Sequence, residues 1–517
     1  MRLSSQFFIL ASIVALVDAA ALSTVKLDYG TFTGLTNTTT GIIYFRGVQY
    51  ADAPVGVLRW QAPVSPPTTQ LGEVDASNYA AGCIANTQTA TTSTTSEDCL
   101  FLNVFLPIAT TAYSALPVLV YFHGGGFEGQ STHIYPPENI IQGSAQPLIF
   151  VTVEYRLGQF GFLGQLLLSL FISHKILRAN GIGGSAVKTN GTLNAGLLDQ
   201  KAALVWIQRY ITKFGGDPTR VTIWGQSAGG GSTMLHLIGD NAGNGKLFHQ
   251  AMGDSPSLGP LPHYTDAFVE DLFTQFAGFA GCGSSGSNAA IMTCLRAAPT
   301  NTLALAGSQT NANLTSTIYP FGPIQDGAYI STRPVEAFLN GDFVRVPVLY
   351  GSNTDDGANW SANLPNPAAN TSSENATETT VYKFIQGQFH TFTEASFHTA
   401  ITELYPFADY KNVSLQGQQM YGELRYICTA VMITGAAHNF GLPAYQYRWD
   451  NPKLDSNHSS ELAAFFNGAE TFDTANEELV VAMRSYFTSF ATSGVPTANN
   501  SIVWPVSTVA DNQTQQV

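Results

Sequence analysis

One serine stands in a sequence setting that would expose a nucleophile. Residues 221–230 read Val-Thr-Ile-Trp-Gly-Gln-Ser-Ala-Gly-Gly, a β-branched strand that runs through Gly225-x-Ser227-x-Gly229 into a small-residue helix start. A serine on such a strand-to-helix turn has a strained backbone that holds its hydroxyl in the open, and bulky neighbours would collide across the turn. The motif also occurs by chance, so Ser227 is a convincing candidate only if a base, a carboxylate and an oxyanion hole accompany it.

A glycine loop could form the oxyanion hole. The apolar strand expected at 116–122 is followed by residues 123–127, which read His-Gly-Gly-Gly-Phe. Glycines in this arrangement let the backbone aim its N–H groups at a substrate carbonyl, and the N–H of Ala228, directly after the serine, would complete the hole. Taken alone the loop could also be a flexible turn, which is the less favoured interpretation, and beside the serine motif it becomes improbable.

Two adjacent aspartates are candidates for the carboxylate that orients the base. The expected strand 345–350 runs into a loop, 351–357, that contains Asp355 and Asp356. In open α/β sheets, functional groups gather at the C-terminal ends of the strands, which places this loop in the right layer. Asp-Asp-Gly is otherwise typical of a turn, and the sequence leaves the choice between the two carboxylates open.

His458 is the best candidate for the base among the ten histidines. It follows the expected strand 444–449 by one short loop, whereas His438 precedes that strand and would lie at the opposite edge of the sheet. His123 belongs to the glycine loop, and His174 lies in a doubtful segment treated below. A single loop histidine is more often a solvated bystander, but the order serine, acid, histidine along the chain is the order that an α/β-hydrolase sheet requires.

The elements that would position these residues alternate along the chain. Continuous apolar runs at 116–122 and 148–153 are typical of strands buried on both faces, and further strands are expected at 221–224, 346–350 and 444–449. Helical patterns at 197–214 and 478–491 lie among them. The pattern predicts an α/β fold, with one large and mostly parallel sheet flanked by helices and carrying insertions. Residues 21–60 are expected to form a small β-rich part at the N-terminus.

The N-terminus resembles an export signal. Met1 and Arg2 lead into an apolar run and then small residues at 19–21, so we expect residues 1–20 to be removed and 21–517 to form a single catalytic domain. Charged residues are only 11% of the 517-residue chain, and the net charge of −14 argues against nucleic acid and anionic membranes as partners. We expect an exported protein with no integral membrane association, no cofactor and no metal, and the sequence leaves its oligomeric state undetermined.

Cysteines and sequons fit an extracellular protein. The two close-spaced pairs predict disulfides Cys83–Cys99 and Cys282–Cys294, and the apolar surroundings of Cys428 predict a buried thiol. Glycosylation sequons stand at Asn37, Asn190, Asn313, Asn359, Asn370, Asn375, Asn412, Asn457, Asn499 and Asn512. A glycan on Asn457 would obstruct the neighbouring His458, so we expect that sequon to be unused.

One internal stretch does not fit its surroundings. Residues 165–183 place an apolar run, Leu166–Ile172, inside an otherwise polar connection. It could be a greasy flap over the pocket. The preferred interpretation is a retained intron, because deleting these residues joins Gly164 to Gly184 in a plausible glycine-rich loop and removes an exposed aggregation-prone run.

Nearly the whole mature chain resembles the type-B carboxylesterase/lipase family, α/β-hydrolases that include cholinesterases and secreted fungal lipases. The resemblance rests on 225–230 (Gly-Gln-Ser-Ala-Gly-Gly), 97–104 (Glu-Asp-Cys-Leu-Phe-Leu-Asn-Val), 155–163 (Tyr-Arg-Leu-Gly-Gln-Phe-Gly-Phe-Leu) and 194–204 (Asn-Ala-Gly-Leu-Leu-Asp-Gln-Lys-Ala-Ala-Leu). By position it implies Ser227 as nucleophile, His458 as base, Asp356 as acid, and Gly125, Gly126 and Ala228 as oxyanion donors. It also supports both disulfides and places 165–183 outside the family pattern.

Three departures from the family pattern bear on the substrate. The acid is usually a glutamate, so Asp356 is one methylene shorter, and Gln226 stands where many members have a glutamate, which weakens the case for cationic substrates. The Cys83–Cys99 loop lacks the choline-binding tryptophan and the long amphipathic lid of some relatives, so neither a cholinesterase nor interfacial activation is expected.

The family also leads us to expect a longer C-terminus, so we expect either a missing last helix or a truncated gene prediction after Trp504.

The combined expectation is a secreted serine hydrolase that cleaves carboxylic esters through an acyl-enzyme intermediate. The alternative is a non-catalytic binding or adhesion protein on the same scaffold, which would give no reason to keep a serine, an acid and a histidine together. The sequence does not specify the acyl or alcohol group, nor does it separate esterase from lipase activity.

Overall fold

The computed structural model describes residues 22–164, 186–284, 286–467, 472–498, 503–507 and the short strand 515–516. The expected signal segment 1–20 and the suspect stretch 165–183 lie outside these residues, as do the sequons Asn499 and Asn512.

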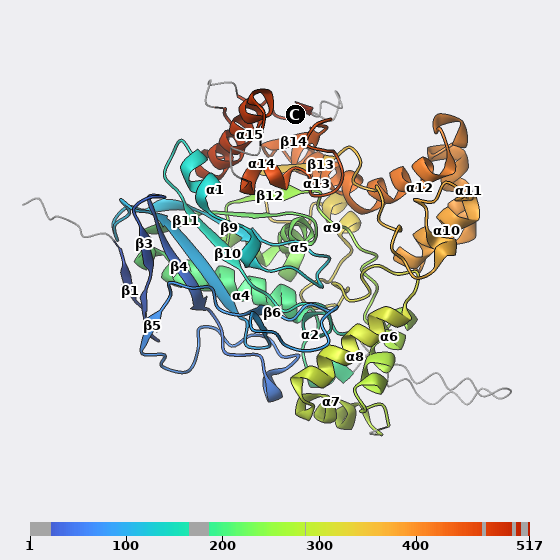
Figure 1. Ribbon diagram of the computed structural model, residues 1–517, viewed down its shortest axis with the longest axis horizontal. Helices are drawn as coiled ribbons and strands as arrows, with labels where there is room; N and C mark the ends of the chain where they lie inside the picture. Colours follow the sequence, from blue (N-terminus) through green and yellow to red (C-terminus); the bar gives the residue numbers. More distant parts are fainter. Residues whose placement is uncertain are drawn as a thin grey trace, which may run out of the picture.

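A 10-stranded sheet runs through the centre of the molecule in the order β15-β14-β13-β12-β11-β9-β10-β8-β4-β3 (Figure 1). Neighbouring strands are parallel from β15 to β10 and antiparallel from β10 to β3. The parallel strands are β9 (Leu116–Phe122), β10 (Ile149–Val153), β11 (Gly216–Gly225), β12 (Gln250–Asp254), β13 (Val348–Asn353), β14 (Ala444–Trp449) and β15 (Gln515–Gln516). The antiparallel strands are β3 (Leu35–Asn37), β4 (Ile42–Gln49) and β8 (Phe101–Pro107).

The predicted α/β architecture is confirmed, and most expected elements lie where the patterns placed them. β9 and β14 have the expected bounds, and the helix expected at 197–214 is α4 (Ala195–Tyr210) continued by a 3-10 turn, Ile211–Phe214. The helix expected at 478–491 lies inside the longer α15 (Thr474–Ser493). The sequence pattern did not predict β12. This strand is buried on both faces, but it begins with Gln250 and ends with Gly253 and Asp254, which are not typical of a strand.

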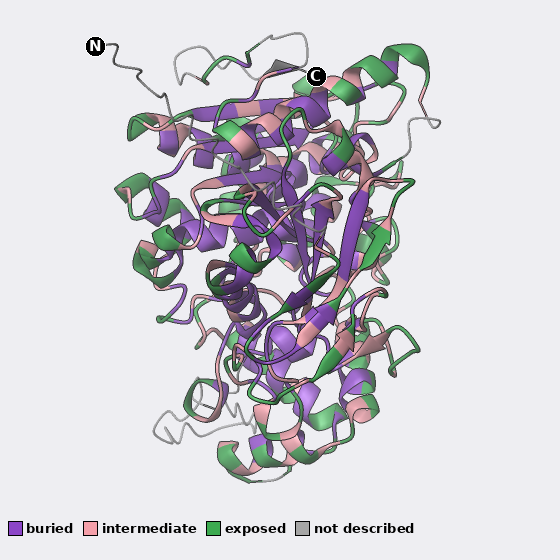
Figure 2. Ribbon diagram, turned by 90° about the vertical axis from the view of Figure 1, so that its left-hand side faces the viewer, coloured by how far each residue is buried: buried purple, intermediate pink, exposed green. Residues whose placement is uncertain are grey.

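Helices cover both faces of the sheet, and each face has its own hydrophobic core. One core gathers α1 (Glu138–Gly143), α14 (Leu462–Phe466) and α15, which lie together in Figure 1. The other includes α4, α5 (Ala228–Ala242), α6 (Ala267–Phe279), α7 (Asn288–Ala297), α8 (Thr300–Asn313), α9 (Pro334–Asn340) and α13 (Cys428–Asn439). The short helices α2 (Gly158–Gly161) and α3 (Ala186–Asn190) flank the suspect stretch. Figure 2 shows the strands buried between these layers. Among the described helices, none is both long and apolar enough to cross a bilayer.

The N-terminal region is β-rich, as expected, but it does not stand apart from the main sheet. β1 (Thr24–Lys26), β2 (Thr31–Thr33) and β5 (Glu73–Asp75) form a 3-stranded sheet, whereas β3 and β4 extend the central one. The short strands β6 (Gly82–Cys83) and β7 (Thr95–Ser96) pair within the loop that the Cys83–Cys99 disulfide closes. A second disulfide joins Cys282 to Cys294.

A third hydrophobic cluster lies in a helical extension made of α10 (Glu378–Gln388), α11 (Glu394–Thr399) and α12 (Val413–Gly422), which projects at the right of Figure 1. Between α12 and α13 the chain makes a π-helical turn, Glu423–Ile427. The prediction of a buried thiol at Cys428 is wrong, since that residue is exposed. The π turn adds a residue to the helical repeat, so the face expected from α-helical spacing no longer points inward after it.

Candidate active site

The Ser227 turn has the strained geometry that its sequence predicts. Ser227 sits between β11 and α5 with φ 57° and ψ −118°, a positive φ that is rare for a residue with a side chain. Its N–H donates to the Asp254 carbonyl at 2.9 Å, and its carbonyl accepts from the Gly231 N–H at 2.8 Å. A side chain on Gly229 would collide with the Phe122 carbonyl, so only glycine allows α5 to start this close to β9.

Asp356 and His458 meet although they are far apart in the sequence. His458 Nδ1 lies 2.7 Å from Asp356 Oδ1, and both side chains are buried. Since a carboxylate only accepts, Nδ1 carries the proton of this bond and Nε2 is free to accept one. Asp355 turns away from the imidazole and accepts from the Ser456 hydroxyl at 2.5 Å, which ties the two loops together.

One backbone donor and one side-chain donor hold the Asp356 carboxylate. Its Oδ2 accepts from the Asn353 N–H and from the Ser255 hydroxyl, each at 2.9 Å. The Asn353 side-chain amide also donates to Glu461, a buried residue three positions after His458. Burial, reinforced by the charges of Asp254 and Asp356, raises the pKa of Glu461 well above its usual range, so Glu461 stays neutral and leaves Asp356 as the charge beside the imidazole.

Gln226, the residue before Ser227, contacts the His458 ring and the residue that follows it. The Gln226 amide nitrogen lies 3.3 Å from His458 Nε2 and donates to the Ser459 hydroxyl at 2.8 Å. Within the described part of the chain, the Ser227 hydroxyl makes no hydrogen bond to His458. Bonds between a nucleophile and its base are often long until substrate binds. The Gln226 amide, which now contacts Nε2, has to release that nitrogen before it can take the serine proton.

The glycine loop lies directly beside the serine. A side chain on Gly124 would touch the Ser227 Cβ at 3.2 Å, and Gly125 and Gly126 adopt φ values of 90° and 66°. Among the hydrogen bonds of the described residues, none uses the N–H groups of Gly125, Gly126 or Ala228. The positive φ values explain why glycine is needed at positions 125 and 126, and the unused N–H groups are available to an incoming oxygen.

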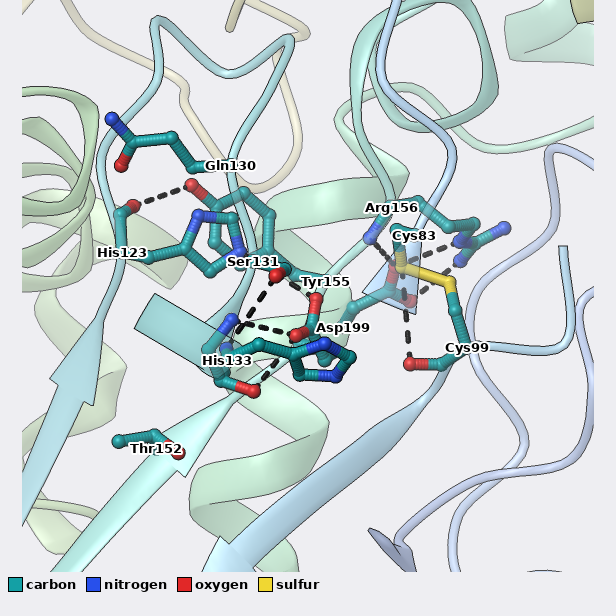
Figure 3. A network of polar contacts seen from close by, with 12 residues as sticks. Cys83, Cys99, His123, Gln130, Ser131, His133, Thr152, Tyr155, Arg156 and Asp199 are labelled. Atoms are coloured by element: carbon teal, nitrogen blue, oxygen red, sulfur yellow. Dashed lines mark hydrogen bonds and ion pairs between the residues drawn. A yellow bond between two sulfur atoms is a disulfide. The ribbon is translucent and has the colours of Figure 1, made fainter. Parts of the chain in front are cut away.

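His123 fixes the base of this loop. Figure 3 shows the Tyr155 hydroxyl bonded to the His123 carbonyl, at 2.7 Å, with the two rings stacked 4.5 Å apart. Burial lowers the pKa of His123 to about 4, so the ring is neutral at ordinary pH. Its Nε2 lies 3.8 Å from the buried Glu154, whose pKa burial raises to about 7.

Two aromatic side chains pack against the His458 ring, and the sequence interpretation missed both. The Tyr426 ring lies 4.2 Å and the Trp360 ring 5.1 Å from the His458 ring, centroid to centroid. Trp360 also donates to the Asp356 carbonyl at 2.7 Å, a contact hinted at by its place four residues after that aspartate. Tyr426 has no such signal, because the π turn of 423–427 brings it in from a distant helix.

The site contains the parts of an acyl-transfer centre and little that would hold a metal. Within the described residues, no group of three or more His, Cys, Asp or Glu side chains lies close enough together to bind a metal ion. What the loops bring together is a strained serine, a buried imidazole bonded to a carboxylate, and unused backbone donors.

Comparisons with known proteins agree with this arrangement. A family model described as the carboxylesterase family matches residues 21–167 and 185–517. Lipase 2 of Geotrichum candidum is 32% identical over 77% of this chain and 71% of its own, and Secreted lipase 1 of Botryotinia fuckeliana is 29% identical over 95% and 88%. The crystal structure of Aspergillus niger EstA superposes with a TM-score of 0.79 at 28% identity, covering 94% of this chain and 92% of that one. The chain therefore belongs to the carboxylesterase family, has the α/β-hydrolase fold and is a carboxylic ester hydrolase.

Proposed function

We propose that the protein is a secreted serine esterase with Ser227 as nucleophile, His458 as general base and Asp356 as the orienting acid. The observation that carries the proposal is the 2.7 Å contact between His458 Nδ1 and Asp356 Oδ1, at the edge of the sheet where the Ser227 turn also lies. Binding alone would not need a buried, correctly tautomeric imidazole next to a strained serine.

The reaction follows from the roles of these groups. The Ser227 oxygen attacks the ester carbonyl while His458 Nε2 takes its proton, and the N–H groups of Gly125, Gly126 and Ala228 stabilise the negative oxygen that forms. His458 then gives the proton to the departing alcohol oxygen as the carbon–oxygen bond breaks. Water, deprotonated by the same nitrogen, cleaves the acyl-enzyme and restores Ser227.

Export and processing are part of the proposal. Residues 1–20 would be a cleaved signal peptide, 21–517 a single catalytic domain, and 165–183 a retained intron that the mature protein lacks. Two disulfides, a secreted relative and a family match that resumes only at residue 185 support this assignment. Exposed sequons suited to glycosylation are Asn313, Asn359, Asn375 and Asn412.

The test is hydrolysis of p-nitrophenyl butyrate by the wild type and by Ser227→Ala. We expect kcat to fall about 10⁴- to 10⁶-fold in the variant. Ser232→Ala is the matched control, because Ser232 lies one turn further along α5 with its hydroxyl bonded to the Ala228 carbonyl at 2.9 Å. An inactive wild type, or a Ser227→Ala variant as active as Ser232→Ala, would favour the non-catalytic binding protein.

A further inference from the structure

A mostly apolar pocket opens beside the glycine loop. Its walls include Gly126, Phe127, Phe162, Leu261, Leu272 and Tyr319. Neither His458 nor Trp360 lines it. Since the alcohol of an ester must leave next to His458 to receive its proton, the pocket on the glycine-loop side takes the acyl group.

Arg425 is a buried cation in the wall of this pocket, whose other polar lining residues are Ser257, Thr317, Gln388 and His390. The residue is 6% exposed, its Nε has no hydrogen-bond partner, and its guanidinium carbon lies 6.0 Å from the centroid of the Tyr319 ring. Tyr319 in turn packs so closely on Gly126 that no side chain would fit there. The guanidinium is therefore one ring away from the oxyanion loop.

The other buried arginines of the described chain all bind a carboxylate or backbone carbonyls, although Nη1 of Arg156 also lacks a hydrogen-bond partner. Arg59 and Arg156 each bind a carboxylate through two nitrogens, Glu97 and Asp199 respectively. Arg484 donates to two backbone carbonyls. Within the same described residues, no carboxylate lies within 4.0 Å of the Arg425 nitrogens.

Neighbouring groups do not neutralise this charge. Glu128 interacts with Arg425 at longer range, but its two oxygens accept from the Phe321 N–H at 2.6 Å and from the Asn86 amide at 2.7 Å. Burial raises the pKa of Glu128 to about 8, which weakens the negative charge that this group offers to Arg425 at neutral pH. The remaining close groups are the hydroxyls of Tyr319, Tyr421 and Tyr426, which are neutral. A buried charge without a counter-ion is costly, and a guanidinium is the group best suited to gripping a carboxylate.

A π-helical turn places this side chain in the pocket wall. Arg425 and Tyr426 both lie in the π turn of 423–427, and both are buried. Such turns interrupt a helix at some cost and are frequent at functional sites. One turn thus supplies the ring that packs on His458 and the cation that faces the acyl pocket.

We propose that Arg425 binds a carboxylate at the far end of the acyl group, so that the preferred substrates are half-esters of dicarboxylic acids. The proposal rests on the proposed esterase function and names its substrate class. The neutral Gln226, in place of a glutamate, leaves one negative charge fewer beside such a substrate.

The experiment compares half-esters with neutral esters of the same length. The initial rates of hydrolysis of monomethyl succinate, glutarate and adipate, and of their dimethyl esters, are measured in a pH-stat for the wild type, Arg425→Met and Arg425→Lys. We expect the wild type to prefer at least one half-ester, and Arg425→Met to lower the ratio of half-ester to diester kcat/KM by about ten- to a hundredfold. Arg425→Lys should recover part of that ratio, which a purely structural role would not explain.

Arg484→Met is the matched control, because it removes a buried arginine outside this pocket and should leave the ratio unchanged. Glutarate should inhibit the wild type competitively and more strongly than neutral glutaramide, a readout that needs no folded variant. Diester hydrolysis without half-ester preference, with glutarate no better than glutaramide, would overturn the role of Arg425 while leaving the esterase intact. No hydrolysis of any ester would overturn both proposals.

Discussion

At the scale of single residues, the site depends on which carboxylate faces the imidazole. Asp356 lies fully buried with its oxygens directed to His458, Ser255 and Asn353, whereas the exposed Asp355 binds Ser456. The residues alone narrowed the choice to these two neighbours, and only the family resemblance pointed to Asp356, because the direction of each side chain follows from the tertiary contact between two loops.

Asp356→Asn and Asp355→Asn therefore form a matched pair. The amide at 356 would favour the wrong imidazole tautomer, so we expect kcat for p-nitrophenyl butyrate to fall about 10⁴-fold. The amide at 355 should cost less than about tenfold, because the residue is exposed and only braces the loop. Equal losses in steady-state assays of the two variants would contradict the assignment.

The buried Glu154 side chain makes the stability of the folded protein depend on pH. Burial raises its pKa from 4.5 to about 7, so the folded protein holds this proton to higher pH than the unfolded chain. The associated stability is fully present below about pH 4.5 and is lost as the pH rises through about 7, to the extent of roughly 3 kcal/mol.

Glu154→Gln should remove that part of the pH dependence. The amide keeps the oxygen that accepts from Thr132 while it abolishes the titration. Melting temperatures measured from pH 4.5 to 8 should then decline less than those of the wild type, and Asp342→Asn, an exposed change, should leave the slope as it is. A variant with an unaltered slope would show that Glu154 does not titrate in this range.

At the scale of elements, the sequence predicted the strands that have a regular hydrophobic pattern. It missed a strand and a turn whose structure depends on tertiary contacts. A continuous apolar run located β9, because both faces of a central parallel strand are buried. β14 is recognisable by its alternation of buried aromatic residues with the partly exposed Gln446 and Arg448. β12 escaped notice because its Asp254 is polar, yet it accepts from Trp224 at 2.7 Å and Tyr447 at 2.8 Å in the interior. Arg425, Tyr426 and Cys428 were beyond reach because a π turn changes the helical repeat that the prediction assumes.

The loop between Cys83 and Cys99 is an element with consequences for substrate choice. The disulfide and a hydrogen bond from the Asn86 N–H to the Glu128 carbonyl, at 2.7 Å, hold it in place, and its exposed part is mostly threonine. It presents no large apolar face that could open onto a lipid surface.

We therefore expect no interfacial activation. In a pH-stat assay with tributyrin, the rate should follow a smooth saturation curve as the ester concentration passes its solubility limit. A sharp increase in rate at the appearance of droplets would mean that another segment acts as a lid.

At the scale of the whole molecule, one sheet brings together residues from three distant parts of the chain. β11, β13 and β14 are parallel, so the loops that carry Ser227, Asp356 and His458 leave the same edge. The described residues that form the site all lie outside the stretch 165–183, which the family match also omits almost entirely.

Deletion of residues 165–183 tests that independence. We expect the shortened protein to be secreted in higher yield, with a melting temperature and p-nitrophenyl butyrate activity at least equal to those of the full chain, because an apolar run is removed. Sequencing of the mature transcript gives the independent check. Loss of folding on deletion, together with a transcript that encodes the stretch, would support the flap interpretation instead.

The central claim is that Ser227 becomes acylated with His458 as its base, and covalent trapping measures this directly. The wild type and His458→Ala are incubated with a fluorophosphonate, and the adduct is located by mass spectrometry of the peptides. The account predicts one adduct per chain on Ser227, formed far more slowly in His458→Ala. An adduct on another residue, or ester hydrolysis that continues after Ser227 has been fully modified by the reagent, would contradict it.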